Sequence, residues 1–223
     1  MDISVIIAVY NDEKHIERAI RSCLNQTIPH QDYEIIVVDD GSTDSTPAIL
    51  SDFEKWLLPD WVRVITLPEN KGVGYASNQG IRAAKGQFVV RVDSDDYVNE
   101  HLLFIERMYL INNKEMTAIA CDYLIVDEDE RVLGRQSPIQ LPIACGVMFR
   151  KDKLIDVGLY KEMRIGEERD LFHRFVEKYG IYRIALPLYR YYQSANSITK
   201  KNEELWQRID TNPPTYERWN EKV

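Results

Sequence analysis

The first 92 residues alternate between short apolar runs and helical patterns. The runs are almost continuous, are rich in Ile and Val, and cover residues 3–9, 34–38, 62–67 and 88–92. Such runs are typical of strands that are covered on both faces, as in a parallel sheet. The sequence therefore predicts a mostly parallel central sheet in this part of the chain.

Three helices are predicted between these runs. Apolar residues recur at helical spacing over residues 16–24, and Asn11 is the expected N-cap of this helix. Capping residues and an early proline at 43–47 open a second helix, and residues 74–84 form a third. Strand and helix alternation of this kind predicts an α/β fold, Rossmann-like, with helices flanking the sheet.

The second half of the chain has a less regular pattern. Residues 118–126, 132–134 and 143–149 are predicted as strands of a smaller mixed or antiparallel extension, and residues 169–179 as a helix. Beyond residue 199 the composition becomes polar, with a short helix expected around 203–209. We predict one domain over 1–199 and a polar C-terminal tail over 200–223.

Composition narrows the class of protein. The chain has 223 residues, 44% of them hydrophobic, and a formal net charge of -8, which suits one sizeable core and argues against binding nucleic acid. Its cysteines, Cys23, Cys121 and Cys145, show no spacing typical of zinc or disulfides and are predicted to be buried thiols. Since no apolar run reaches the roughly 18–20 residues that span a bilayer, and no signal peptide is evident, we expect a cytoplasmic protein without a transmembrane segment.

An acidic loop follows the fourth apolar run. Asp93, Asp95 and Asp96 place three carboxylates within four positions, and such groups raise each other's pKa unless a cation lies among them. The pattern predicts a divalent metal. The alternative is a solvated turn that caps the next helix, because Asp and Ser suit helix starts.

Polar segments follow three of the predicted strands, at residues 8–11, 39–44 and 93–96. In open α/β sheets, ligands bind beyond the carboxyl ends of the strands. We therefore expect a nucleotide site, with Tyr10 available to stack on a base. Two simpler interpretations stay open: Tyr10 is an ordinary residue at a strand end, and one of Asp39 and Asp40 only forms an Asx turn.

Four ordered phrases, VIIAVYND, VVDDGSTD, NKGVGYASNQG and VDSDDY, closely resemble family 2 glycosyltransferases with the GT-A fold. The resemblance covers roughly residues 1 to 199. It implies a donor half at 1–98 and an acceptor and catalytic half at 99–199. It also implies a nucleotide-diphosphate sugar as donor, for which a UDP-sugar is favoured while guanosine and thymidine donors stay open.

The resemblance assigns roles residue by residue. Tyr10 and Asp39 contact the base, Asp93 lies near the ribose, and Asp95 coordinates the metal, with Asp93 as the second metal candidate. Oxygen ligands favour Mg²⁺ or Mn²⁺. The full set of expected donor-site residues is Ala8, Tyr10, Asn11, Asp39, Asp40, Asn70, Lys71, Gly72, Asn78, Asp93, Ser94 and Asp95.

An inverting transfer needs a base that takes the proton of the acceptor hydroxyl. The family usually has an Asp for this role in a Glu-Asp pair at the start of a late helix, and alignment on Arg174 puts Glu168 at that position. Glu168 has apolar residues three and four positions on, whereas Asp170 has polar ones, so Glu168 faces more nearly toward the cleft. We rank Glu168 first, Asp170 second and Glu167 third. The alternative is that Glu168 serves only the helix N-terminus.

A second departure from the family lies near Ser194, where relatives often carry a His that reaches the metal or the diphosphate. Arg190, or the hydroxyls of Ser197 and Thr199, are candidates to contact phosphate instead.

The function that this resemblance predicts is a metal-dependent, inverting sugar transfer to a hydroxyl acceptor, in glycan or polysaccharide biosynthesis. The acceptor is a glycan, a lipid-linked molecule or a protein. Two rivals stay open: a nucleotidyltransferase that makes nucleotide sugars, and a non-catalytic nucleotide-sugar-binding protein. Trp206 and Trp219 in the tail are compatible with contact to a membrane surface or a partner, and no feature of the sequence sets the oligomeric state.

Overall fold

The computed structural model describes residues 1–56, 61–138, 143, 145–163 and 166–193. Within these ranges, no helix is both long enough and apolar enough to cross a membrane. The predicted helix around 203–209, and the residues Ser194, Ser197, Thr199, Trp206 and Trp219, lie outside the described residues.

Four parallel strands form the first half of the sheet, as the apolar runs predict. Their order is β3-β2-β1-β4, so β1 lies between β2 and β4. All seven residues of β1 and all seven of β2 are buried, which explains why the runs carry so few polar side chains. The strands are β1 (Ile3–Val9), β2 (Tyr33–Asp39), β3 (Val62–Thr66) and β4 (Phe88–Arg91).

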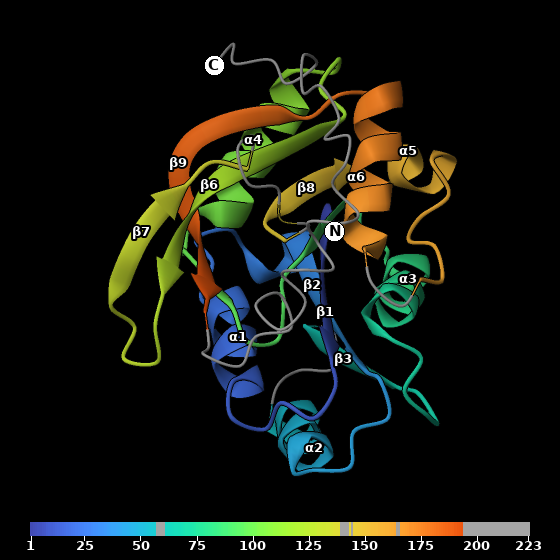
Figure 1. Cartoon of the computed structure of the whole chain (residues 1–223), viewed down its shortest axis with the longest axis vertical. Helices are drawn as coiled ribbons and strands as arrows, with labels where there is room; N and C mark the ends of the chain where they lie inside the picture. The colour runs from blue at the N-terminus through green and yellow to red at the C-terminus, as the bar shows by residue number, and fades with distance from the viewer. Residues whose placement is uncertain (57–60, 139–142, 144, 164–165, 194–223) are drawn as a thin grey trace.

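The other half of the sheet is mixed and continues in the order β4-β8-β6-β9-β5, while β7 pairs with β6 at the side. β8 is antiparallel to β4 and β6, whereas the long strand β9 runs parallel to β6. Its strands are β5 (Tyr97–Val98), β6 (Ala118–Val126), β7 (Val132–Gln136), β8 (Val147–Arg150) and β9 (Tyr182–Tyr192). The prediction of an α/β fold with a smaller mixed extension is confirmed (Figure 1).

Helices cover both faces of the sheet (Figure 1). The sheet separates the hydrophobic core into two layers, one on each face. Along β1, Ile3, Val5 and Ile7 pack into one layer and Ile6 and Ala8 into the other, as alternation along a strand requires. The first layer is closed by α1 (Ile16–Leu24), α2 (Thr46–Trp56) and α4 (Leu102–Asn112). The second is closed by α3 (Val73–Ala83), α5 (Lys151–Asp156) and α6 (Glu167–Lys178). A short 3-10 helix (His30–Asp32) precedes β2.

Two local predictions are wrong. Helix α1 begins at Ile16 after His15 and has no side-chain cap, because Asn11 adopts a left-handed backbone conformation with φ 49° and turns its side chain to the loop after β2. β8 begins only at Val147, since Gly146 before it has φ 66° and bends the chain. The predicted strand over 143–149 is therefore shorter than expected.

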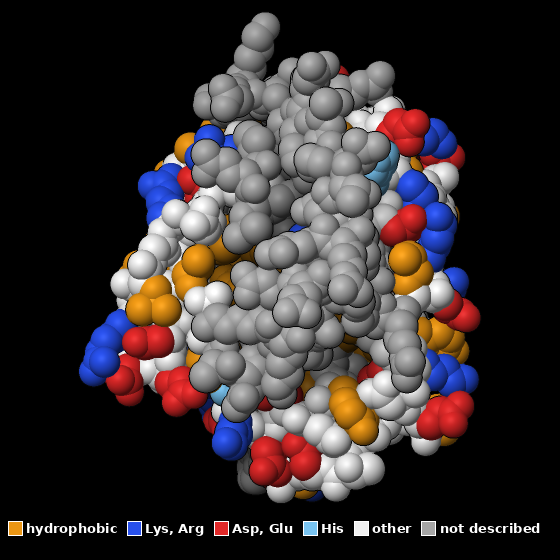
Figure 2. Space-filling view, in the orientation of Figure 1, with side chains coloured by type: hydrophobic (Ala, Val, Ile, Leu, Met, Phe, Trp, Pro, Cys, Tyr) orange, Lys and Arg blue, Asp and Glu red, His pale blue; other side chains and the backbone are white. Residues whose placement is uncertain are grey.

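The surface charge is mixed where it can be seen. Figure 2 shows Lys and Arg side chains interspersed with Asp and Glu side chains around the described part of one face.

Candidate functional site

The carboxyl ends of β1, β2 and β4 bring the three polar segments to one edge of the sheet. Val9 pairs with Asp39 across β1 and β2, and Ile6 pairs with Arg91 across β1 and β4. Asp93 follows β4 by two residues. The expectation that these segments share one edge is therefore met by the strand register.

The loops after β1 and β2 are joined by hydrogen bonds. The Oδ1 atom of Asn11 accepts from the backbone N–H of Thr43 at 2.7 Å and of Asp44 at 3.3 Å, while the N–H of Asn11 donates to Ser42 Oγ at 2.9 Å. Tyr10 stands beside this junction with 47% of its surface exposed. The Tyr10 ring is accessible to a ligand, and the hydrogen bonds of Asn11 shape the loop that carries Tyr10.

Asp39 and Asp40 are both buried and have different partners. Asp39 accepts from the N–H of Ser42 at 2.9 Å, which makes Asp39 the turn-forming residue of the two. Asp40 accepts from the N–H groups of Lys71 at 2.9 Å and Gly72 at 2.7 Å. Burial raises the pKa of Asp40, and these two bonds oppose the rise. Asp40 thus ties the segment before α3 to the end of β2.

Asn78 is committed to the backbone in this structure. Its Nδ2 donates to the carbonyl of Tyr160 at 2.8 Å, and its Oδ1 accepts from the N–H of the same residue at 3.1 Å. The exposed Asn70 and Lys71 precede it on the loop into α3. Of these expected donor-site residues, Asn70 and Lys71 are the accessible ones, whereas Asn78 joins α3 to the chain before α6.

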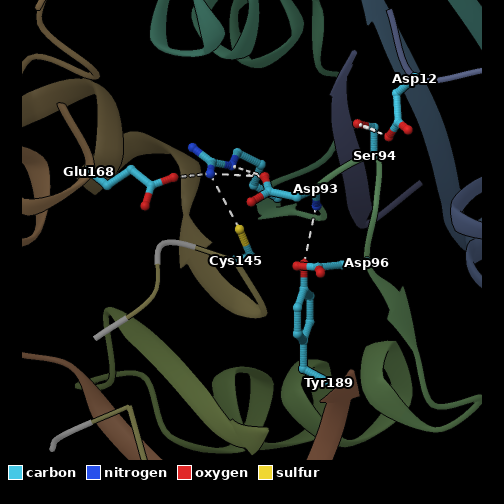
Figure 3. Close-up of polar contacts among 8 residues, drawn as sticks. Asp12, Asp93, Ser94, Asp96, Cys145, Glu168 and Tyr189 are labelled. Atoms are coloured by element: carbon cyan, nitrogen blue, oxygen red, sulfur yellow. Dashed lines mark hydrogen bonds and ion pairs between the residues drawn. The ribbon is translucent and has the colours of Figure 1, made fainter. Parts of the chain in front are cut away.

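The acidic loop after β4 is held from the far end of the chain. The Tyr189 hydroxyl on β9 accepts from the N–H of Asp93 at 3.1 Å and donates to Asp96 at 2.6 Å (Figure 3). The other oxygen of Asp96 accepts from the N–H of Tyr192 at 2.7 Å. Asp96 is 1% exposed, and its carboxyl group therefore shapes the loop while Asp93 and Asp95 stay half-buried.

Asp12 brings a fourth carboxylate to the acidic loop, beside Asp93, Asp95 and Asp96. Burial raises the pKa of Asp95 to about 7, and the nearby Asp93 and Asp12 add to the rise. Asp12, in the loop after β1, accepts a hydrogen bond from Ser94 at 2.7 Å (Figure 3). Such crowding of acids is unfavourable without a cation, so the oxygen-donor set of Asp93 and Asp95 fits Mg²⁺ or Mn²⁺.

Glu168 reaches the acidic loop through Arg91. The Arg91 guanidinium donates from Nε to Asp93 Oδ1 at 3.0 Å and from Nη2 to Glu168 Oε1 (Figure 3). The side chain of Glu168 is 34% exposed. Burial, Asp93 and Glu167 raise the pKa of Glu168, and Arg91 opposes them without cancelling the rise.

The other two base candidates face elsewhere. Asp170 accepts from Lys161 at 2.8 Å and from Arg174 at 2.7 Å, and these cations hold its pKa below the usual value although burial opposes them. Glu167 is buried against α3, where a Cβ at Gly74 would lie 3.2 Å from its Cγ. Of the three candidates, the structure brings Glu168 to Asp93.

In the described part of the chain, one group of three potential metal ligands comes together. Ligand atoms of Asp93, Cys145 and Glu168 lie within 4.8 Å of one another. The Arg91 guanidinium already lies among them, with Nη2 at 3.3 Å from Cys145 Sγ, and burial raises the pKa of that thiol. This trio is therefore bridged by an arginine, and a hard cation suits the oxygen-only pair Asp93 and Asp95 better.

Sequence reasoning did not identify three residues that shape the site: Asp12, Arg91 and Tyr189. Arg91 carried a signal, because a charged residue at the end of the apolar run 88–92 needs a partner when buried. Asp12 and Tyr189 lie 82 and 96 residues from their partners Ser94 and Asp93, and no spacing in the sequence indicates such pairs.

A cavity of about 590 Å³ adjoins the acidic loop between α1 and β5. Arg18 lines it and donates to the backbone carbonyl of Asp95 at 2.7 Å. The lining residues are Lys14, Glu17, Arg18, Arg21, Ser22, Asn25 and Val98. Neither Arg91 nor Glu168 lines this cavity, so it is not the place where the candidate base lies.

Comparisons with known proteins agree with this architecture. The fold resembles Staphylococcus aureus TarS 1-349 in complex with UDP-GlcNAc, with a TM-score of 0.76, 23% identity, and coverage of 90% of this chain and 61% of that one. It also resembles the mannosyltransferase PcManGT from Pyrobaculum calidifontis in complex with GDP-Man and Mn²⁺, with a TM-score of 0.72, 18% identity, and coverage of 93% and 61%. The sheet and its flanking helices thus have the same fold as these two structures.

Sequence comparison gives the family. The model of glycosyl transferase family 2 matches residues 4–175, and the chain belongs to that family. It is 36% identical over 127 residues to the putative glycosyltransferase EpsH of Bacillus subtilis, covering 57% of this chain and 35% of EpsH. It is 45% identical over 104 residues to a poly(ribitol-phosphate) beta-glucosyltransferase of Bacillus spizizenii, covering 46% and 16%. The matched region thus spans well under half of these curated relatives.

Proposed function

We propose that this chain transfers a sugar, with inversion, from a nucleotide-diphosphate donor to a hydroxyl acceptor in glycan or polysaccharide biosynthesis. One observation carries the proposal. Arg91 brings the half-exposed Glu168 of α6 to Asp93 of the acidic loop, although 77 residues separate Arg91 from Glu168. A base candidate and a donor-site carboxylate are thus held next to each other, as a displacement in which a base activates the acceptor requires.

The donor half supplies binding and orientation. The exposed ring of Tyr10 is placed to stack on the base, and the neighbouring Asp39 is the proposed base contact. Asp93 and Asp95 would hold the divalent metal, which supplies positive charge to stabilise the departing nucleoside diphosphate. Ser94 fixes the loop by its bond to Asp12.

The catalytic half supplies the base. Glu168 takes the proton of the acceptor hydroxyl as that oxygen bonds to the anomeric carbon and the bond from that carbon to the diphosphate breaks. The raised pKa of Glu168 suits a group that must accept a proton. We rank Asp170 below it, because two cations, Lys161 and Arg174, hold the pKa of Asp170 below its usual value.

Relatives guide the choice of substrates. The TarS structure contains UDP-GlcNAc, and a Bacillus spizizenii relative is named for glucosyl transfer to poly(ribitol-phosphate). We therefore propose a UDP-sugar as donor and a hydroxyl of a cell-surface polymer or its lipid-linked precursor as acceptor. The reaction is placed on the cytoplasmic side, where nucleotide sugars are available as donors.

Thermal unfolding with nucleotides tests the donor site. UDP, GDP, dTDP and CDP are compared with and without Mn²⁺, because a ligand that binds only the folded state raises its Tm. We expect UDP to raise Tm only when Mn²⁺ is present, and Asp95→Ala to abolish that rise. Asp129→Ala is the matched control, since Asp129 is an exposed acid in the turn between β6 and β7.

Two outcomes would contradict the proposal. Release of pyrophosphate from a nucleoside triphosphate and a sugar phosphate would show a nucleotidyltransferase. Metal-dependent UDP binding with no donor hydrolysis and no transfer to any hydroxyl acceptor would show a non-catalytic binding protein.

A further inference from the structure

Arg91 is a buried charge in an apolar strand. It is 4% exposed, and its chain neighbours Val90 and Val92 are fully buried. The Tyr160 ring lies 5.4 Å from the guanidinium carbon. Placing a guanidinium there has a large desolvation cost, so its partners must explain its presence.

The partners of Arg91 are the two halves of the proposed reaction centre. On one side Nε and Nη2 approach Asp93 Oδ1 at 3.0 Å and 2.9 Å. On the other side Nη2 pairs with Glu168 Oε1 (Figure 3). Because a guanidinium is planar and rigid, it fixes the distance and direction between the two carboxylates, which a flexible ammonium cannot do.

Glu168 depends on this contact for its orientation. In the parts of the chain that the structure describes, Arg91 is the only hydrogen-bond partner of the Glu168 carboxylate. Glu168 is the second residue of α6, after Gly166 with φ 91°, and no side chain caps this helix start. Without Arg91 the carboxylate would keep several rotamers at a half-exposed position.

The arrangement is poorly suited to stability alone. Nη1 of Arg91 is buried and has no hydrogen-bond partner in the described chain. A buried charge with an unused donor costs stability, and an apolar residue of similar size would fill the same space at lower cost. A role for Arg91 in the site explains why this buried charge is present although it does not favour stability.

We propose that Arg91 is a positioning residue that holds the Glu168 carboxylate at a set separation from Asp93 and so directs the base at the acceptor hydroxyl. The inference rests on the proposed sugar transfer. Replacement of Arg91 removes both contacts, and loss of the Glu168 contact is expected to slow the chemical step.

The first experiment measures kcat and the donor KM for Arg91→Met and Arg91→Lys. We expect Arg91→Met to lower kcat by about 10²-fold, within the range by which general bases contribute, and to change the donor KM by less than about threefold. Arg91→Lys should recover little, because one ammonium cannot keep both contacts in place. An unchanged kcat, or a loss confined to KM, would overturn the proposal.

Arg150→Met is the matched control for the loss of a strand arginine. Arg150 lies on β8, and its guanidinium donates to the carbonyls of Met116 and Leu110, away from Glu168. Comparable loss of Tm with kcat retained in this variant would show that destabilisation does not itself slow the reaction. Equal loss of kcat in both variants would assign the effect to stability and overturn the proposal.

A double-mutant cycle tests whether Arg91 acts through Glu168. If it does, Arg91→Met combined with Glu168→Gln should have the kcat of Glu168→Gln alone, within about threefold. Losses that multiply would show that Arg91 acts independently of the base. A wild-type chain that transfers no sugar from any donor would contradict the proposed function itself. An active wild type with an equally active Arg91→Met variant would contradict only the role proposed for Arg91.

Discussion

Two networks of arginine and carboxylate groups in this fold have opposite compositions. On β6, one carboxylate, Asp122, accepts from two arginines, Arg135 at 2.7 Å and Arg183 at 2.7 Å. At the end of β4, one arginine, Arg91, donates to two carboxylates, Asp93 and Glu168. The first has an excess of positive charge and the second an excess of negative charge.

Burial in the two networks is also reversed. The Asp122 side chain is 2% exposed, while those of Arg135 and Arg183 are 47% and 24% exposed. In the other network the Arg91 side chain is 5% exposed. Its two carboxylates are 29% and 34% exposed. In the Asp122 network the buried group is the acid and its arginines face outward, so we expect this network to stabilise the sheet. In the Arg91 network the buried group is the cation and its carboxylates are accessible to a ligand.

The largest expected effect is a loss of activity when the Arg91 network is changed at Glu168. Glu168→Gln should lower kcat by about 10²- to 10⁴-fold, because it removes the proton acceptor, with little change in the free energy of unfolding. Steady-state transfer assays and urea unfolding measure the two quantities. Asp170→Asn is the comparison variant, and a greater loss of kcat there would move the base to Asp170.

Breaking the sheet network should affect stability instead. Asp122→Asn leaves two arginines without their carboxylate, and we expect a loss of about 2–3 kcal/mol in the free energy of unfolding, in the range for hydrogen bonds to charged groups. The kcat of the folded protein should stay within about twofold. Urea titration at constant pH gives the first value. A fall in kcat without a loss of stability would contradict the division between the networks.

A fourth carboxyl group, outside both networks, sharpens the comparison because no arginine among the described residues is paired with it. Glu106 on α4 is fully buried, and neither oxygen has a normal hydrogen-bond partner in the described chain. Burial raises its pKa well above the usual value, which outweighs the opposing effect of the Cys121 thiol. In the unfolded chain it ionises near pH 4.3.

The difference between the pKa of Glu106 in the folded and in the unfolded chain makes the free energy of unfolding depend on pH. Above about pH 4.3 the unfolded chain releases the proton that the folded chain retains, so Glu106 lowers stability increasingly as pH rises. Glu106→Met should therefore raise the free energy of unfolding by about 1–3 kcal/mol at pH 8 and by less at pH 4.5. Thermal unfolding across this range measures it. A benefit that is constant with pH would show that packing, and not ionisation, is responsible.

The sequence predicts the first half of the fold well because burial on both faces leaves a continuous apolar run. The predicted bounds of β1 are those observed. β9 is not predictable in the same way, since its buried positions do not alternate and Pro187 lies at a shift of its register against β6. The local pattern around Tyr182–Tyr192 therefore lacks the alternation that marks a half-buried strand.

The candidate site is predictable only in part for a similar reason. Loops at strand ends follow from the order of the elements, so Asp93 and Asp95 could be placed at the sheet edge. Helical spacing favours Glu168 over Asp170, and in the structure Glu168 is the one that faces Arg91. The contact of Glu168 with Arg91 spans 77 residues and depends on packing of α6 against β4 and β8, which no local pattern encodes.

The hydrogen bonds that join the acidic loop to β9 affect when this loop can fold during synthesis of the chain. Asp96 finds its two partners, Tyr189 and Tyr192, 93 and 96 residues later in the sequence. While the ribosome is still adding the residues between them, the loop that follows β4 lacks these bonds and Asp96 remains unpaired with β9. The acidic loop therefore reaches its final conformation only when nearly all of the described chain has been translated, late in folding as for other contacts of high sequence separation.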